Sequence, residues 1–271
     1  MPRDPRIWLG GGFILFLALA AIFAPLLAPF DPLEQDLMAA TAAPGAEPGH
    51  WLGTDSLGRD LLSRLIHGTR IALTVAFVAA TLACLLGTTL GLLAGYYRGW
   101  VDAGVSRLID IWMAFPPVLL SILLVAVLGA GLTSVIAAIV VIDWTRFARV
   151  VRAETLQQAR LEYAEAASAL GMGRGAILWR EVLPNVLPVV LVLLSLEMGI
   201  AVIVEAILSF VGLSVSTDTP TWGGMIAEGR QIIYQAWWVL VFPLGALFLT
   251  VLAFNQLGDG LRQWLDPILK R

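Results

Sequence analysis

Lysine is almost absent from this chain of 271 residues, and that scarcity removes one class of function before any motif is considered. The one lysine, Lys270, lies at the end of the sequence. A P-loop needs a lysine in its glycine-rich segment to reach the phosphates of a nucleotide. The chain therefore has no Walker A site, and we expect any ATP hydrolysis coupled to it to occur in a separate subunit.

Cysteine and histidine are also scarce, which restricts metal and nucleophile chemistry. The single Cys84 excludes an internal disulfide, and two histidines with one cysteine cannot form a usual zinc site. His50 and His67 lie in one predicted loop, and no Gly-x-Ser-x-Gly elbow occurs. We expect no catalytic residues, no metal and no cofactor in this chain, and no enzymatic role. The net charge of −3 gives no indication of nucleic-acid binding.

Charged residues make up only 14% of the chain, and hydrophobic residues make up 59%. Soluble domains have about 25% charged and 45–50% apolar residues. A transmembrane helix needs about 20 apolar residues, and a chain in lipid must satisfy its own backbone groups. The composition therefore predicts an all-α polytopic membrane protein with about six transmembrane helices. The six stretches are residues 7–29, 71–95, 108–130, 132–151, 183–212 and 236–257.

The spans divide the chain into an N-terminal part (1–70), a five-helix core (71–265) and a short tail (266–271). The first apolar stretch is longer than a signal-peptide core, so we interpret it as a retained helix followed by an outer loop. At the end of that loop, residues 60–66 have apolar side chains on one helical face. This pattern predicts a segment at the membrane surface before the second span.

The distribution of arginine and lysine predicts the orientation. Six spans place both termini on one side, and thirteen basic residues then share the side of the termini while four lie opposite. Basic residues favour cytoplasmic loops, so both termini and the 152–182 loop are predicted to be cytoplasmic. The thirteen are Arg3, Arg6, Arg98, Arg107, Arg146, Arg149, Arg152, Arg160, Arg174, Arg180, Arg262, Lys270 and Arg271, and the four are Arg59, Arg64, Arg70 and Arg230.

The 152–182 loop has the most informative pattern. Alanine and glutamate predict a short helix from about residue 162, and Gly171 is the residue type that ends such helices. Tyr163, Ala166, Ala167 and Leu170 are expected to share one flank. From the pattern alone, this is either a plain surface helix-turn-helix or a small-residue face on which another protein docks.

The loop resembles the EAA loop of permease subunits of ATP-binding cassette importers. The resemblance rests on Glu165-Ala166-Ala167, Gly171 and Leu183-Pro184, while Glu181 stands where the family usually has an apolar residue. It implies that this loop forms the helix that couples the permease to the ATPase. The residues implied in coupling are Glu162, Glu165, Ala166, Ala167, Gly171, Leu183 and Pro184.

Further motifs extend the resemblance over nearly the whole chain, to the dipeptide, oligopeptide and nickel permeases. They include His50–Asp60 (HWLGTDSLGRD), Ala114–Pro117 (AFPP), Leu208–Leu213 (LSFVGL) and Gly258–Arg262 (GDGLR) with Asp266-Pro267. The resemblance implies a type I importer permease fold and a C-type subunit in the cell membrane of a bacterium or archaeon. The implied partners are membrane lipid, a homologous B-type permease, two ATPase subunits that bind ATP and magnesium, and an extracytoplasmic binding protein.

Two carboxylates interrupt the fifth apolar run. Glu197 and Glu205 are eight residues apart, which places them about 80° apart around a helix. A carboxylate at the bilayer centre costs at least about 2.5–3.5 kcal/mol, so each must face protein or water. One hypothesis places both on the translocation path, and the other pairs each with a polar group on a neighbouring helix.

Other polar and small residues within the spans suggest helix contacts. Asp143 precedes Arg146 by three residues, a spacing that permits an ion pair on one face. Gly87, Gly91 and Gly95 form a small-residue face for close helix packing.

The implied substrates are short peptides, with nickel and glutathione as alternatives. An ion-coupled carrier that uses the intramembrane acids is the alternative from another class.

Overall fold

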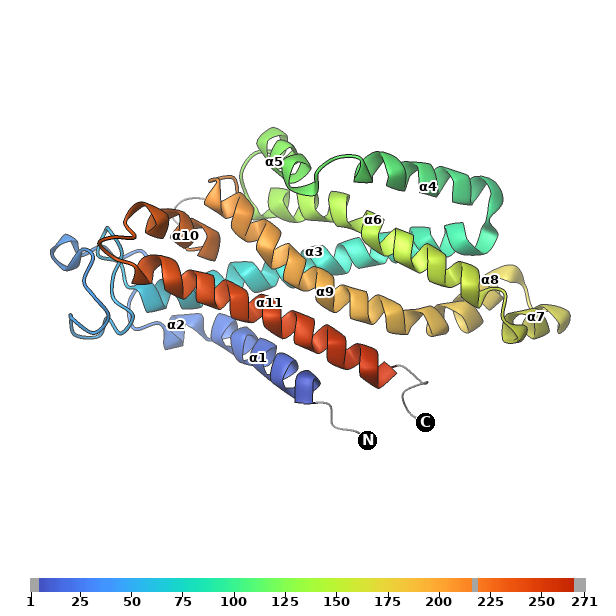
Figure 1. The fold of residues 1–271 in the computed structure, drawn as a ribbon, viewed down its shortest axis with the longest axis horizontal. Helices are drawn as coiled ribbons and strands as arrows, with labels where there is room; N and C mark the ends of the chain where they lie inside the picture. The colour runs from blue at the N-terminus through green and yellow to red at the C-terminus, as the bar shows by residue number, and fades with distance from the viewer. Residues whose placement is uncertain (1–4, 216–218, 266–271) are drawn as a thin grey trace.

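The computed structural model describes residues 5–215 and 219–265, and its regular elements are helices, as predicted (Figure 1). The predicted tail, including Asp266-Pro267, lies outside these residues. In chain order the elements are α1 (Pro5–Ile22), α2 (Ala24–Leu27), a 3₁₀ turn (Leu37–Ala39), α3 (Leu61–Tyr97), α4 (Gly99–Met113), α5 (Pro117–Leu128), α6 (Leu132–Gln158), α7 (Glu162–Ala169), α8 (Arg174–Ile177), a π-helical turn (Leu178–Val182), α9 (Leu183–Phe210), α10 (Trp222–Gln231) and α11 (Trp238–Leu265).

Four helical segments in the described residues are long and apolar enough to cross a membrane. They are Pro5–Ile22, Leu61–Tyr97, Arg174–Phe210 and Trp238–Leu265, and the bent α4–α5 pair makes a fifth if it is one span. α6 has 27 residues but contains Asp143, Arg146 and Arg149, so it is more polar than the others and does not meet the same criterion. The structure thus supports four or five spans where the sequence predicted six.

The span predicted at 108–130 is not one continuous helix. α4 and α5 meet at an angle of 87° across the break between Met113 and Pro117. Pro117 has no N–H to donate, and its ring disfavours the helical conformation at Pro116, which is extended (φ −60°, ψ 121°). Hydropathy runs unchanged through the two prolines, whereas the backbone cannot continue as one helix.

The segment 60–66 does not lie separately at the membrane surface, as we expected, but forms the first turns of α3. The Asp60 carboxylate caps this helix by accepting the backbone N–H of Ser63 at 2.7 Å. Leu61 and Arg64 are buried, and Leu61 belongs to the same apolar cluster as Trp222 of α10. The apolar face that suggested a lipid surface therefore packs against the chain itself.

The glycine face of α3 packs against α6, as predicted. A Cβ atom on Gly91 would lie 2.7 Å from the carbonyl oxygen of Ala148 and 2.9 Å from Cβ of Val151. Gly87 and Gly95 meet α6 one turn to either side with similar closeness. Because no side chain larger than hydrogen fits at these positions, the two helices are in backbone contact along this face.

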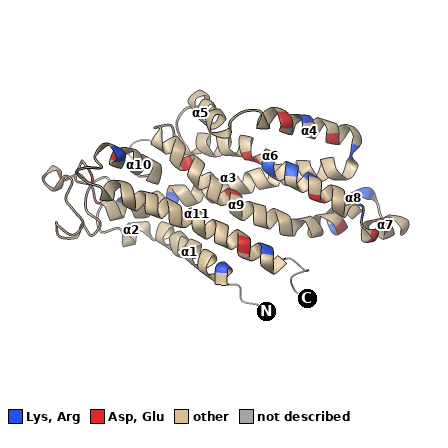
Figure 2. Cartoon of the chain, in the orientation of Figure 1, with Lys and Arg blue, Asp and Glu red and all other residues tan. Residues whose placement is uncertain are grey.

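The long helices run side by side, with the loop before α3 and helix α10 at one end and α7 and α8 at the other (Figure 1). The described start of α1 and the end of α11 both lie toward the α7 end (Figure 1). Basic positions occur along α6, in α8 and near those two helix ends, and others lie in α10 and α3 (Figure 2). The 152–182 loop and the outer loop therefore occupy opposite ends of the bundle.

Candidate functional site

α7 projects from the end of the bundle with one face packed and one face free. Ala164 and Ala167 are buried in a cluster that includes Phe147 of α6. Glu165 and Ala166 are exposed on the other side. The predicted flank is therefore partly wrong: Ala164 is packed instead of Ala166, and Leu170 is 88% exposed, because α7 packs against α8 and the π-helical turn.

The turn after α7 is closed by a Schellman motif centred on Gly171. The Met172 N–H donates to the carbonyl of Ala167 at 3.1 Å, and the Gly171 N–H donates to that of Ser168 at 3.0 Å. Gly171 has φ +82°, and no other part of the chain lies within 4 Å of where its Cβ would be. The requirement for glycine there is therefore one of backbone conformation alone.

The second half of the loop is continuous with the following span. α8, the π-helical turn and α9 form one helical segment from Arg174 to Phe210. The helix widens to the π form just before Pro184, where a proline ring would otherwise clash with the carbonyl four residues earlier. Leu183 is half-buried and Pro184 is exposed at this junction. The prolines therefore widen the entry to the span without interrupting it.

Glu197 is held by α6. Nη1 of Arg146 donates to Oε2 of Glu197 at 3.0 Å, and Nε of Arg146 lies 3.9 Å from Oδ1 of Asp143. The predicted pair of Asp143 and Arg146 is therefore present and shares its guanidinium with Glu197. Only 3% of Glu197 is exposed in this chain.

Glu205 has different partners. Its Oε1 accepts hydrogen bonds from the hydroxyls of Ser209 at 2.5 Å and Ser214 at 3.1 Å. The residue is 1% exposed and lies two turns further along α9 than Glu197. The structure thus does not bring the two carboxylates together at one group of partners.

A cavity of about 630 Å³ lies between α6, α9 and α11, toward the α7 end. Its walls include Glu154, Gln158, Asn185 and Arg262 among mostly apolar side chains. Neither Glu197 nor Glu205 lines it. It is therefore an amphipathic space with both signs of charge on its walls.

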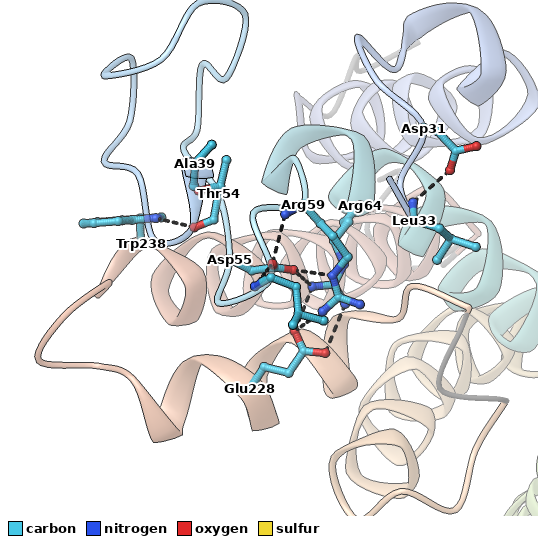
Figure 3. Close-up of polar contacts among 10 residues, drawn as sticks. Asp31, Leu33, Ala39, Thr54, Asp55, Arg59, Arg64, Glu228 and Trp238 are labelled. Atoms are coloured by element: carbon cyan, nitrogen blue, oxygen red, sulfur yellow. Dashed lines mark hydrogen bonds and ion pairs between the residues drawn. The ribbon is translucent and has the colours of Figure 1, made fainter. Parts of the chain in front are cut away.

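A charge cluster joins the loop before α3 to α10 at the opposite end (Figure 3). The fully buried Asp55 carboxylate accepts from Nε of Arg59 at 2.7 Å and also from Arg64. Glu228 of α10 accepts from the same two arginines, at 3.0 Å from Arg59 and 2.7 Å from Arg64. We call these four residues the outer charge cluster.

Sequence reasoning missed Glu228 as a member of this cluster. It is separated from Arg64 by 164 residues, so no local spacing indicates the pair. Burial alone would raise the pKa of the Glu228 carboxyl, but the hydrogen bonds and charges of Arg64 and Arg59 outweigh burial and lower that pKa. The two guanidinium groups therefore favour the ionised form of Glu228.

Neighbouring bonds fix the same loop to α11 and α3. Nε1 of Trp238 donates to the carbonyl of Thr54 at 3.0 Å, and Nδ1 of His50 lies 2.9 Å from Oδ1 of Asp60 (Figure 3 shows the first). His50 thus belongs to the folded loop, whereas His67, which we predicted in the same loop, lies in α3, where its Nδ1 is 2.9 Å from the carbonyl oxygen of Ser63. Among residues 5–215 and 219–265, no group of three or more His, Cys, Asp or Glu side chains is placed to hold a metal ion.

A family model described as a binding-protein-dependent transport system inner membrane component matches residues 87–271. The chain belongs to this family. A second model, described as the N-terminal TM domain of oligopeptide transport permease C, matches residues 3–44 of the permease. Together the two models account for most of the sequence.

Curated relatives resemble the permease over almost its full length. The glutathione transport system permease protein of Pectobacterium atrosepticum is 44% identical over 96% of this chain and 86% of the relative. The dipeptide transport system permease proteins of Alkalihalophilus pseudofirmus and Haemophilus influenzae are 43% and 39% identical, over 93% and 96% of this chain and 82% and 89% of their own lengths. The permease is thus of the type found in peptide importers of the ATP-binding cassette class.

Solved structures agree with the fold. The MetNI methionine ABC transporter in inward-facing conformations matches with a TM-score of 0.63 and 21% identity, over 76% of this chain and 98% of that one. As a permease subunit, the chain is a multi-pass membrane protein and not itself an enzyme. ATP is bound by separate ATPase subunits, and the permease functions in a complex with these and with a partner permease.

Proposed function

We propose that this permease forms, with a homologous B-type permease, a translocation pathway for short peptides, including the tripeptide glutathione. The observation that carries the proposal is the 39–44% identity to dipeptide and glutathione permeases over nearly the whole chain. An extracytoplasmic binding protein delivers the peptide, and two ATPase subunits supply the energy. ATP-driven closure of the ATPases moves the permeases as rigid bodies and changes which side of the pathway is open.

The proposed orientation places α7 and both ends of the chain in the cytoplasm of a bacterial or archaeal cell. The bias of basic residues supports it, since it leaves only four of the seventeen on the outer side. The arrangement in Figure 1 agrees, because α7 and the described ends of α1 and α11 lie toward the same end. The outer charge cluster then lies on the side where the binding protein docks.

The proposed contact with the ATPase is the free face of α7. Glu162, Glu165 and Ala166 are exposed there, while Ala167 faces inward and belongs to the apolar cluster that α7 shares with α6, α8 and α9. Gly171 fixes the turn that ends the helix. Leu183 and Pro184, at the start of α9, transmit the displacement of the loop to the span.

Glu197 and Glu205 are proposed to stabilise the helix bundle, because each has hydrogen-bond partners within this chain. Glu197→Gln should lower the yield of assembled complex, since it leaves the Arg146 guanidinium without one of its two carboxylates. Uptake per assembled complex should stay unchanged. Loss of uptake at normal assembly in either Gln variant would instead place that carboxylate on the translocation path.

The decisive experiment is purification of the tagged chain in mild detergent from its own host. We expect ATPase subunits and a second permease to co-purify. The complex is then reconstituted with its binding protein, and uptake of labelled dialanine, labelled glutathione and Ni²⁺ is compared at equal ATP. Uptake driven by a proton gradient without any ATPase would overturn the proposal in favour of an ion-coupled carrier.

A further inference from the structure

A chain of side-chain hydrogen bonds leads from α7 to the cavity between α6, α9 and α11. The Tyr163 hydroxyl donates to Oε1 of Gln158 at 2.9 Å. Nε2 of Gln158 donates to Oε1 of Glu154 at 2.8 Å. Glu154 and Gln158 both line the cavity, so the chain begins on the helix proposed to couple and ends in the cavity wall.

The bond between Tyr163 and Gln158 spans the corner between two helices. Gln158 is the last residue of α6, and Tyr163 is the second residue of α7. Glu154 lies one turn before Gln158 on the same face of α6. A movement of α7 relative to α6 therefore changes the first hydrogen bond directly, while the second lies within one rigid helix.

The chemistry of the three groups fixes the direction of the chain. An ionised carboxylate only accepts hydrogen bonds, so Gln158 must present its NH₂ to Glu154 and its oxygen outward. That oxygen then needs a donor, and the hydroxyl of Tyr163 supplies it. The Glu154 carboxylate thus sets the orientation of the Gln158 amide, and the Tyr163 hydroxyl holds the other end of that amide in place.

The opposite wall of the cavity has a polar group of its own. Asn185 on α9 lines the cavity, and its side chain donates to the carbonyl of Glu181 at 2.7 Å. The polar groups of the α6 wall and of the α9 wall are therefore held by separate hydrogen bonds.

We propose that Tyr163, Gln158 and Glu154 are positioning residues that tie the wall of this cavity to the position of α7. When the ATPase displaces α7, the bond between Tyr163 and Gln158 breaks. The Gln158 amide is then held at one end only, so it and the Glu154 carboxylate bonded to it can turn together into the cavity. The relay thereby couples the charge presented to a peptide in the cavity to the state of the ATPase. The proposal rests on the proposed function, in which α7 contacts the ATPase.

The test uses the complete transporter in proteoliposomes, with ATPases, partner permease and binding protein. The measured quantity is ATP hydrolysed per molecule transported, with whichever of labelled dialanine and labelled glutathione the wild type moves. Tyr163→Phe removes only the hydroxyl, and Gln158→Leu removes the middle of the relay. Each should raise the ratio about threefold to tenfold, as loss of one net hydrogen bond implies. Gln157→Leu, an exposed neighbour on the same helix, should leave the ratio unchanged.

A double-mutant cycle separates a relay from general destabilisation. The effects of Tyr163→Phe and Glu154→Gln on the ratio should be non-additive when Gln158 is present and additive in the Gln158→Leu background. The relay is refuted if the Tyr163 and Glu154 variants, in complexes of normal yield, hydrolyse the same amount of ATP per molecule transported as Gln157→Leu does. Failure of the proposed function is visible separately, since the wild type would then bind no ATPase at all.

Discussion

The outer charge cluster gives the sharpest prediction, because Asp55 is fully buried between two arginines. Its carboxylate accepts from the side chains of Arg59 and Arg64 and from two backbone N–H groups, those of Leu57 at 2.8 Å and Arg59 at 3.1 Å. Asp55→Asn keeps the shape and removes the charge. Two buried guanidinium groups then share Glu228 alone, and an amide NH₂ faces them in place of an acceptor.

Removing one partner from a buried ion pair costs about 3–5 kcal/mol, because the remaining charge is left uncompensated. For a chain of this size such a loss lowers the unfolding temperature on the order of 10 °C. The assay is thermal unfolding of the purified complex in detergent, followed by tryptophan fluorescence. Trp222 and Trp238 are buried beside this region and report on its opening.

The matched control is Asp31→Asn in the same loop. Asp31 is exposed and only accepts from the N–H of Leu33 at 2.8 Å, a bond that an asparagine oxygen also makes (Figure 3). We expect this change to stay within about 0.5 kcal/mol of wild type. Equal unfolding temperatures for the Asp55 and Asp31 variants would refute the argument that the cluster fastens the outer end.

Three further predictions concern acid, packing and the loop turn. The folded pKa of Glu228 is lowered, so this residue stabilises the fold fully above its ordinary pKa near 4.5, and that stabilisation is lost as the pH falls through the folded pKa. Glu228→Gln should therefore make stability fall less steeply with decreasing pH in this range, as measured by unfolding at a series of pH values. Gly91→Ala should destabilise by about 1–3 kcal/mol through overpacking, whereas Gly104→Ala, which meets nothing within 4 Å, should not; equal unfolding temperatures would contradict the close contact. Gly171→Val forces a branched residue to φ +82°, at a cost of about 1–2 kcal/mol, and should reduce transport-linked ATPase activity, while Gly173→Val at φ −65° should retain it.

Local patterns were sufficient wherever the partner lies nearby or the residue type is decisive. The three glycines of α3 indicated close packing because only hydrogen allows backbones to approach so closely. The pair of Asp143 and Arg146 followed from its spacing on one helix face. Gly171 was placed correctly because a left-handed residue must close the turn.

The sequence could not indicate contacts between distant segments. No residue near Arg64 in the sequence indicates that Glu228 will face it, and no residue near Glu197 indicates that Arg146 will be its partner. The sequence contains the two prolines, Pro116 and Pro117, that break the helix. A hydropathy average over a window does not register this break, because it scores polarity and not backbone conformation. The flank of α7 was misjudged because an eight-residue helix rich in alanine has no strong apolar side, so the positions of α8 and the π-helical turn decide which face packs.

The uninterrupted helical segment from Arg174 to Phe210 allows a movement of the loop to tilt α8 and α9 together as one rigid element. Its 37 residues, at about 1.5 Å each, span roughly 55 Å. Shifting one end by about 5 Å while the other stays still requires a tilt of only about five degrees, as the same length implies. A displacement of atomic dimensions at α8 can thus tilt the segment along its whole length, and no helix needs to unfold for this to happen.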